Sequence, residues 1–318
     1  MDPALFLGDL EEKPAALARL ANQFRAGDLL APLRPSPRRV LLLGMGSSRY
    51  AAVDAALRMR AAGVDAVADY ASATIGWPAS PDLLVLAISA SGESAETIAA
   101  VERHRGRSRV VALTDAPRST IATLADDVIP LGAGAERGGV ACRSFQHTQL
   151  ILRAVEARLG GRHADMPALC NRGAAASADL LDRRPDWLPE VADALDGPDG
   201  VFLLAPAERL ASAEQGALMI RECPRRPAVG CETGDWSHVD VYLTKTLDYR
   251  ALLFGGSPWD GEALDWLTKR GSTFVSVGAD VPGARFAVRY AGDDDPDVAA
   301  ITEVVIPELI AASWWLAG

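Results

Sequence analysis

Three serines follow a run of apolar residues near position 90. Residues 83–88 read Leu-Leu-Val-Leu-Ala-Ile, and Ser89, Ser91 and Ser94 surround Gly92 directly after them. A helical pattern begins at once, so the segment predicts a buried strand, a turn and a helix N-terminus. Such a turn offers backbone N–H groups, the positive end of a helix dipole and hydroxyl donors, which suit a phosphate ester. The alternative interpretation is a helix capped by serine, which is common.

Other kinds of site find little support in the sequence. The serine loop has no P-loop lysine and no Gly-x-Gly-x-x-Gly pattern, so ATP and dinucleotides are poor candidates and we expect no cofactor. No metal is expected either, because the spacing of the four histidines does not fit zinc. The four scattered cysteines form no Cys-x-x-Cys and indicate reduced thiols.

Composition predicts a folded, acidic protein. The chain has 318 residues, 49% hydrophobic and 23% charged, which is enough for two domains with real cores. A net charge of −10 argues against a nucleic-acid surface, although a local site on an acidic protein can still attract an anion. We expect no signal peptide and no membrane span, and therefore a cytoplasmic location.

Two segments of the chain resemble each other. Residues 40–60 and 201–221, aligned without gaps, share seven of 21 positions, and each reads as a strand, a turn and an Ala-rich helix. Further strands are expected at Leu83–Ile88 and Val110–Leu113, with counterparts at Ala251–Phe254 and Phe274–Val277. Strands that alternate with helices predict parallel sheets covered on both faces, and a repeat of this length indicates a duplicated domain.

The regions around this repeat are predicted to be helical. We expect a helical arm over Asp9–Phe24, ended by the proline-rich Pro32–Pro37, and helices over Ala164–Leu181, Pro185–Leu195 and Ile301–Leu316. The predicted fold is α/β, with two doubly wound domains in tandem and parallel sheets flanked by helices. The predicted boundaries are an arm over 1–36, a first domain over 37–160, a helical linker over 161–198 and a second domain over 199–318.

Only the first half is equipped for a phosphate. Its first turn is Gly46-Ser47-Ser48 and its second is the Ser89–Ser94 loop, whereas the second half has Ala207-Glu208-Arg209 and Gly255–Pro258 at these places. In open parallel sheets, ligands bind beyond the carboxyl ends of the strands. We therefore predict that five serines bind the phosphate: Ser47, Ser48, Ser89, Ser91 and Ser94.

These motifs resemble the SIS (sugar isomerase) family, in particular the isomerase half of glucosamine-6-phosphate synthases and stand-alone double-SIS deaminases and deglycases. Gly46-Ser47-Ser48 is similar to the family's Gly-Thr-Ser turn, and residues 89–94 to its Ser-Gln-Ser-Gly-Glu-Thr loop. Glu136 followed by Val140-Ala141-Cys142 resembles its Glu-x-Gly-Val-Ala-Ser. The resemblance implies that Gly46, Glu136, Val140 and Cys142 line the substrate site.

The resemblance also implies the catalytic residues. Residues 216–222, Gly-Ala-Leu-Met-Ile-Arg-Glu, look like the family's Gly-Ala-Leu-Lys-Leu-Lys-Glu, whose glutamate moves a proton between C1 and C2 of an open-chain sugar. The family has a ring-opening histidine sixteen residues further on, given to the neighbouring subunit's site, and here that position is His238. Glu222 and His238 are therefore the expected catalytic pair in a homodimer with sites at the subunit interface. A carboxylate shielded from water has a raised pKa and suits this proton transfer.

Two differences from the family's sequence pattern help to choose among its possible functions. Met219 replaces the family's lysine in the catalytic motif, and no lysine follows Lys269 in this sequence. The sequence begins Met1-Asp2-Pro3, so we expect no glutamine-hydrolysing domain. The favoured function is an isomerase or deaminase that acts on a keto- or amino-sugar 6-phosphate through an enediol or enolamine.

Two alternatives stay open. One is a non-catalytic phosphosugar sensor, which the missing lysines favour. The other is a pathway-specific deglycase or aminotransferase-like isomerase on an unusual sugar, to which Trp236 could contribute by stacking.

Overall fold

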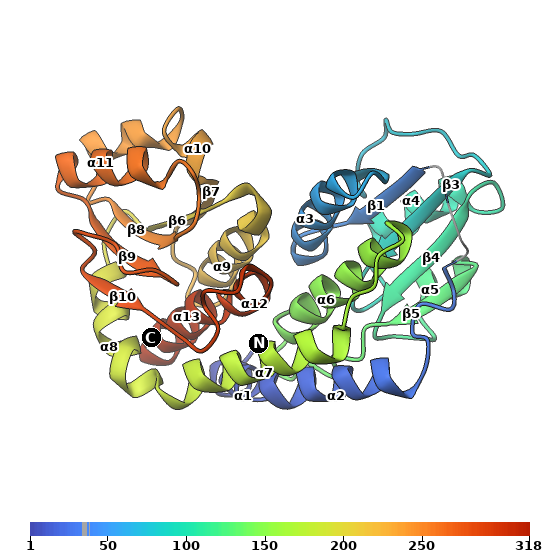
Figure 1. The fold of residues 1–318 in the computed structure, drawn as a ribbon, viewed down its shortest axis with the longest axis horizontal. Helices are drawn as coiled ribbons and strands as arrows, with labels where there is room; N and C mark the ends of the chain where they lie inside the picture. The colour runs from blue at the N-terminus through green and yellow to red at the C-terminus, as the bar shows by residue number, and fades with distance from the viewer. Residues whose placement is uncertain (34–36, 38) are drawn as a thin grey trace. The chain divides into compact units, whose positions relative to one another are not determined.

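The structure is a computed structural model that describes residues 1–33, 37 and 39–318. Part of the predicted Pro32–Pro37 stop, namely residues 34–36, lies outside the described residues. The described chain forms two five-stranded sheets in which every strand pair is parallel (Figure 1). The predicted α/β class with parallel sheets is confirmed.

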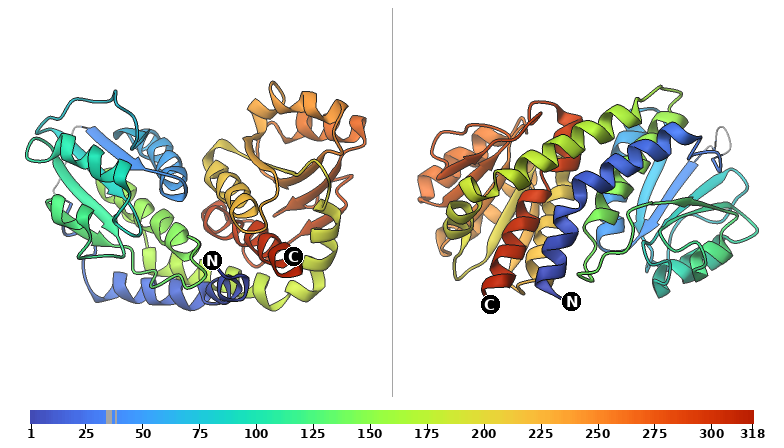
Figure 2. Two further views of the ribbon diagram at one scale, coloured as in Figure 1. Left: turned by 180° about the vertical axis from the view of Figure 1, so that it is seen from behind. Right: turned by 90° about the horizontal axis from the view of Figure 1, so that it is seen from below.

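The first sheet has the order β2-β1-β3-β4-β5. Its strands are β1 (Arg39–Gly44), β2 (Asp65–Tyr70), β3 (Leu83–Ile88), β4 (Arg109–Thr114) and β5 (Asp127–Pro130). All six residues of β3 are buried, because the strand lies in the middle of a sheet covered on both faces. One face packs on α4 (Ala95–His104) and α5 (Thr120–Leu124), and the other carries α3 (Ser47–Ala61) and α6 (Arg143–Leu159) (Figures 1 and 2).

The second sheet repeats this topology strand for strand. Its order is β10-β9-β8-β6-β7, so β6 and β7 correspond to β1 and β2 of the first sheet. The strands are β6 (Val201–Ala205), β7 (Ala228–Glu232), β8 (Arg250–Phe254), β9 (Thr273–Val277) and β10 (Phe286–Val288). The duplication read from residues 40–60 and 201–221 therefore extends to the strand order of whole sheets.

The remaining helices surround the second sheet or join the two halves. They are α1 (Pro3–Glu11), α2 (Lys13–Ala26), α7 (Met166–Asp182), α8 (Arg184–Leu195), α9 (Leu210–Glu222), α10 (Thr233–Trp236), α11 (Asp260–Arg270), α12 (Pro296–Thr302) and α13 (Val305–Ala317), with 3-10 turns η1 (Ala207–Arg209) and η2 (Asp240–Lys245). The single arm expected over Asp9–Phe24 is two helices, α1 and α2. The apolar helix expected over Ile301–Leu316 is divided between α12 and α13.

Contacts within the chain group the residues into two units. The first-sheet unit contains residues 15–136 and 141–171, and the second-sheet unit contains 1–14, 137–140 and 172–318. The predicted arm over 1–36 thus contributes α1 to the second-sheet unit and most of α2 to the other. The predicted four-part domain division remains a prediction.

In the second-sheet unit, α1 packs against α13, where Phe6 lies 6.1 Å from Trp315 between ring centroids. The fully buried Lys13 Nζ pairs with Glu308 Oε2 at 2.6 Å, also without solvent exposure. The stretch Pro296–Ala317 is long and apolar enough to cross a membrane, but 89% of its most apolar window is buried inside the structure. Helices α12 and α13 therefore belong to the core of this unit.

Candidate functional site

The loop after β3 is held in a fixed shape by its own residues. The buried Ser89 Oγ accepts a hydrogen bond from the Gly92 backbone N–H at 3.1 Å. Gly92 has a φ of +68°, and a Cβ there would lie 2.0 Å from Ser119 Oγ. Only glycine fits this position, since another residue would meet both a left-handed backbone and an occupied space.

Ser94 is the N-cap of α4, as the alternative interpretation of the sequence expected. Its Oγ accepts from the Thr97 backbone N–H at 3.3 Å and lies 2.9 Å from Glu96 Oε2, to which it donates. Ser91 is exposed, and its Oγ accepts from the Glu93 N–H at 3.3 Å. Among the described residues, the backbone N–H groups of Ser91 and Ala95 have no hydrogen-bond partner. Capping and anion binding are compatible here, because they use different donors.

Glu93 fastens the loop to the next helix, a feature the sequence reading missed. Its carboxylate accepts from the Thr120 backbone N–H at 2.8 Å and from Thr120 Oγ1 at 2.7 Å. These hydrogen bonds from Thr120 hold the pKa of Glu93 below its ordinary value. The side chain is therefore charged at neutral pH, and its hydrogen bonds with Thr120 connect the serine loop to the first residue of α5.

The turn after β1 lies beside this loop. Gly46 has a φ of +51°, and α3 starts at Ser47 without a side-chain cap. Gly44 lets the helix approach closely, since a Cβ there would lie 2.8 Å from Ser48 Cβ. Strands β1 and β3 are neighbours at the point where the strand order reverses, which is the usual ligand site of such sheets. The structure thus brings the five predicted serines to one edge of the first sheet.

Glu136 has a structural use that the sequence did not reveal. Its Oε1 accepts from the backbone N–H groups of Cys142, Arg143 and Ser144 at 2.7, 2.7 and 3.0 Å, and its Oε2 accepts from Ser144 Oγ at 2.8 Å. The carboxylate therefore caps the start of α6 and complements the helix dipole. Cys142 and Val140 are buried, with exposed fractions of 0% and 1%. The predicted substrate contacts of these three residues remain predictions.

Asp115 is a further carboxyl group at this edge, at the end of β4. Its backbone N–H donates to Ala90 O at 3.1 Å, and its Oδ1 accepts from the Ala133 N–H at 3.1 Å. Burial raises the pKa of Asp115. No sequence motif singled it out, because its place beside the serine loop follows from the strand order.

In the second-sheet unit, Glu222 is the last residue of α9. The side chain is half-buried, and burial raises the pKa of its carboxyl group. No ion pair of Glu222 is found within residues 1–33, 37 and 39–318. The pKa shift is the one expected of a carboxylate base at a site shielded from water.

His238 is exposed and follows α10. It lines a pocket of about 390 Å³ together with Trp259 and three carboxylates, those of Glu232, Asp235 and Glu262. Trp259 is 56% exposed, so an aromatic face borders the predicted ring-opening histidine.

The suggestion that Trp236 stacks on a sugar is wrong. Trp236 is 1% exposed, belongs to the core, and donates from Nε1 to Tyr249 Oη at 2.7 Å. Its indole is needed to fill the space beneath β6 and β8 and cannot reach a ligand. The sequence could not separate Trp236 from Trp259, because both lie beside turn residues.

Comparison with known proteins agrees with this arrangement. Residues 33–157 match the model of the SIS domain. The glutamine-fructose-6-phosphate aminotransferase (isomerizing) of Pyrobaculum aerophilum is 28% identical over 254 residues, which cover 76% of this chain and 42% of that protein. The chain therefore spans less than half the length of the curated relative it matches.

Two solved structures share the fold along the whole chain. The C-terminal domain of glucosamine-fructose-6-phosphate aminotransferase from Francisella tularensis has a TM-score of 0.81 at 17% identity, covering 98% of this chain and 95% of that one. Tagatose-6-phosphate ketose/aldose isomerase from Escherichia coli has a TM-score of 0.80 at 17% identity, covering 100% and 95%. At this identity the likeness shows the fold. The SIS domain model itself covers residues 33–157, and the rest of the chain shares only the fold with these structures.

The SIS domain match contains the five serines but neither Glu222 nor His238. The second sheet has the same topology as the first, with its switch point, where the strand order reverses, between β6 and β8. A side chain of the same unit occupies the loops at this switch point. Arg209, after β6, pairs with Glu303 at 2.5 Å and donates to Gly255 O after β8. A guanidinium that is held by a carboxylate and a carbonyl occupies the corresponding loops. This arrangement supports the prediction that only the first-sheet unit binds a phosphate.

The three lysines are accounted for by other contacts. Lys13 is buried against Glu308, whereas Lys245 and Lys269 are exposed and lie over the rings of Tyr242 and Trp266, at 5.2 and 4.8 Å from the ring centroids. Because each lysine has such a contact, we expect that no lysine of this chain forms an imine with a sugar.

Proposed function

We propose that the chain is a phosphosugar isomerase or deaminase that acts on a keto- or amino-sugar 6-phosphate. The serine loop and the Ser47–Ser48 turn bind the phosphate, and Glu222 is the base that moves the proton. The observation that carries the proposal is the half-buried Glu222, whose raised pKa suits a general base, at the position where the family motif has its glutamate.

One carboxylate is enough to move the carbon-bound proton from C2 to C1. Glu222 as a carboxylate removes the proton from C2 of an open-chain aldose, which leaves a neutral carboxyl group and an enediolate. The carboxyl group then returns the proton to C1 while the hydroxyl proton on O2 passes to O1, which gives the ketose and restores the carboxylate. With nitrogen at C2, the same transfer passes through an enolamine to an imine at C2; water then adds to the imine carbon, and ammonia leaves to give the ketose.

His238 opens the sugar ring in this scheme. A histidine near neutrality can pass a proton between the ring oxygen and the anomeric hydroxyl, and the exposed imidazole of His238 is free to do so. As the resemblance implies, it serves the site of a partner subunit in a homodimer. No cofactor takes part, and a cytoplasmic location fits such a metabolic role.

The test is hydrogen exchange with solvent. Hexose and hexosamine 6-phosphates are incubated with the protein in deuterated water, and deuterium at C1 and C2 is followed by NMR. We expect exchange with one sugar class, its loss in Glu222→Gln, and binding of that variant within a few fold of the wild type. Full exchange in Glu222→Gln refutes the assignment of the base.

A non-catalytic sensor of phosphosugars is the second candidate, favoured by Met219 at the position where the family motif has a lysine. A sensor binds a sugar phosphate in the same experiment without any exchange at C1 or C2. Binding without exchange on every sugar therefore decides for the sensor.

A further inference from the structure

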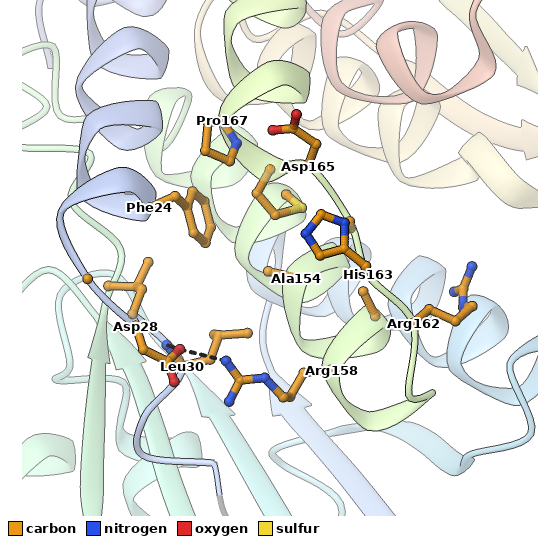
Figure 3. A pocket seen from close by; sticks show the side chains of 14 residues that line it. Phe24, Asp28, Leu30, Ala154, Arg158, Arg162, His163, Asp165 and Pro167 are labelled. Atoms are coloured by element: carbon orange, nitrogen blue, oxygen red, sulfur yellow. Dashed lines mark hydrogen bonds and ion pairs between the residues drawn. The ribbon is translucent and has the colours of Figure 1, made fainter.

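The first-sheet unit has a pocket that the proposed function does not use. It has a volume of about 480 Å³ and lies between the end of α2, the last turns of α6 and the start of α7 (Figure 3). The serine loop lies at the carboxyl edge of the sheet, where α6 begins, whereas this pocket involves the other end of the 17-residue α6. The pocket is therefore separate from the predicted phosphate site.

The floor of the pocket is apolar. Leu30, Ala154 and Met166 are each 5% exposed and close the pocket from below. The Phe24 ring from α2 and the His163 imidazole from the segment before α7 both face the enclosed space (Figure 3). Such a floor with flanking rings suits a flat apolar group, because burial of its faces removes apolar surface from water.

The rim of the pocket offers cationic donors. Arg158 Nη2 donates to Asp28 Oδ1 at 2.6 Å, with side chains 43% and 53% exposed (Figure 3). An ion pair this exposed contributes little to stability, so a ligand can displace or join it. Arg162 also lines the pocket, but its guanidinium is paired with Glu156. Within the described part of the chain no hydrogen bond or ion pair holds the His163 ring.

The carboxylates of the rim are already used. Asp165 Oδ1 accepts from the Ala168 backbone N–H at 3.0 Å, and so caps α7. The hydrogen bond from Arg158 lowers the pKa of Asp28, which is therefore charged and competes for the guanidinium. Since Arg158 has further N–H groups in a planar fork, an incoming carboxylate can be bound by two of them.

We propose that this pocket binds a small organic anion with a flat apolar body, of the aryl carboxylate class. The carboxylate binds to Arg158, with His163 beside it, and the ring lies between Phe24 and the apolar floor. The site is independent of the activity proposed above, because it shares no residue with the serine loop, Glu222 or His238.

The probe is 2-naphthoate, titrated into the full chain by calorimetry. Naphthalene-2-methanol has the same ring without the charge, and acetate has the charge without the ring. We expect saturable binding of 2-naphthoate at submillimolar concentration, at least tenfold weaker binding of the alcohol, and no detectable binding of acetate.

Three variants locate the probe. Arg158→Leu and Phe24→Ala are expected to weaken 2-naphthoate binding at least tenfold. Asp28→Asn is expected to strengthen it severalfold, because it removes the competing carboxylate. The matched control is Arg25→Leu, which removes an exposed arginine of α2 that lies outside the pocket, and it should leave the dissociation constant unchanged.

Arg158→Leu is expected to weaken 2-naphthoate binding and Asp28→Asn to strengthen it, so the test stays decisive even where one variant folds poorly. Loss of an ion pair that only supports structure would weaken binding in both. Absence of saturable binding to the wild type, weaker binding in Asp28→Asn, or an equal effect of Arg25→Leu and Arg158→Leu overturns the proposal.

Discussion

Replacement of Gly92 by alanine tests whether the serine loop has the shape described. The residue has a φ of +68°, and a Cβ would lie 2.0 Å from Ser119 Oγ, 2.4 Å from Ser119 Cβ and 2.9 Å from Ile121 Cγ2. A left-handed backbone costs a non-glycine residue about 1–2 kcal/mol. Forcing a methyl group into occupied space costs about 1–3 kcal/mol more. Gly92→Ala should therefore lower the free energy of unfolding by about 2–5 kcal/mol.

The matched control is Gly106→Ala. Gly106 has a φ of +70°, but no atom lies within 4 Å of the position of its Cβ. This variant carries only the backbone penalty of about 1–2 kcal/mol. The difference between the two variants in urea denaturation isolates the clash with Ser119 and Ile121.

The same pair of variants tests function. Relief of the clash must move the Ser89–Ser94 backbone, so Gly92→Ala should weaken binding of a hexosamine 6-phosphate at least tenfold, whereas Gly106→Ala should leave it unchanged. Equal stability of the two variants would show that the close approach of Gly92 to Ser119 is absent. Unchanged phosphosugar binding in a destabilised Gly92→Ala would instead remove the loop from the site.

Three further predictions concern single carboxylates and their partners. Because burial raises the pKa of Glu222, the acid limb of the exchange rate should lie above the ordinary value of 4.5, and the folded chain should lose stability as pH rises through that window, since it binds more protons there than the unfolded chain; Glu222→Gln should abolish this part of the stability profile, and an unchanged profile contradicts the assigned burial. Glu136→Gln should lower the free energy of unfolding by about 1–2 kcal/mol through weaker capping of α6, measured by urea denaturation, and a neutral result would mean that water replaces the carboxylate. Lys13→Met should cost about 3–5 kcal/mol by leaving Glu308 buried without its ammonium partner, and Lys13→Met with Glu308→Leu should recover most of that loss; a double variant as unstable as the single one rules out this origin of the effect.

The sheets were predictable because their signals are local and repeated. Runs such as Leu83–Ile88 are apolar at every position, which a strand buried on both faces requires, and the two homologous segments predicted the same order of elements twice. Edge strands such as β2 and β10 were not predicted from the sequence. The described residues of β2 include exposed Asp65 and Tyr70, as an edge strand allows, and so lack the continuous apolar run.

The site was predictable only in part, because its second layer depends on contacts between distant residues. The serines follow their strands directly and could be read from the sequence. The bonds from Thr120 to Glu93 join residues 27 positions apart, and the position of Asp115 beside Ala90 depends on strand pairing. Trp236 was misread for the same reason, since its partner Tyr249 lies on another segment.

The duplicated sheets also explain why two similar edges differ in chemistry. Each strand order creates a switch point whose loops expose backbone polar groups, and these groups need a partner. In the second sheet the partner is internal, since Arg209 binds Gly255 O and Glu303. In the first sheet the corresponding loops carry small hydroxyl side chains and backbone N–H groups without a partner in the described chain. One copy of the fold thus satisfies its switch point with its own arginine, and the other leaves donors for an anion, so that Arg209→Ala should not create a second phosphate site unless Glu303, which would repel the anion, is also removed.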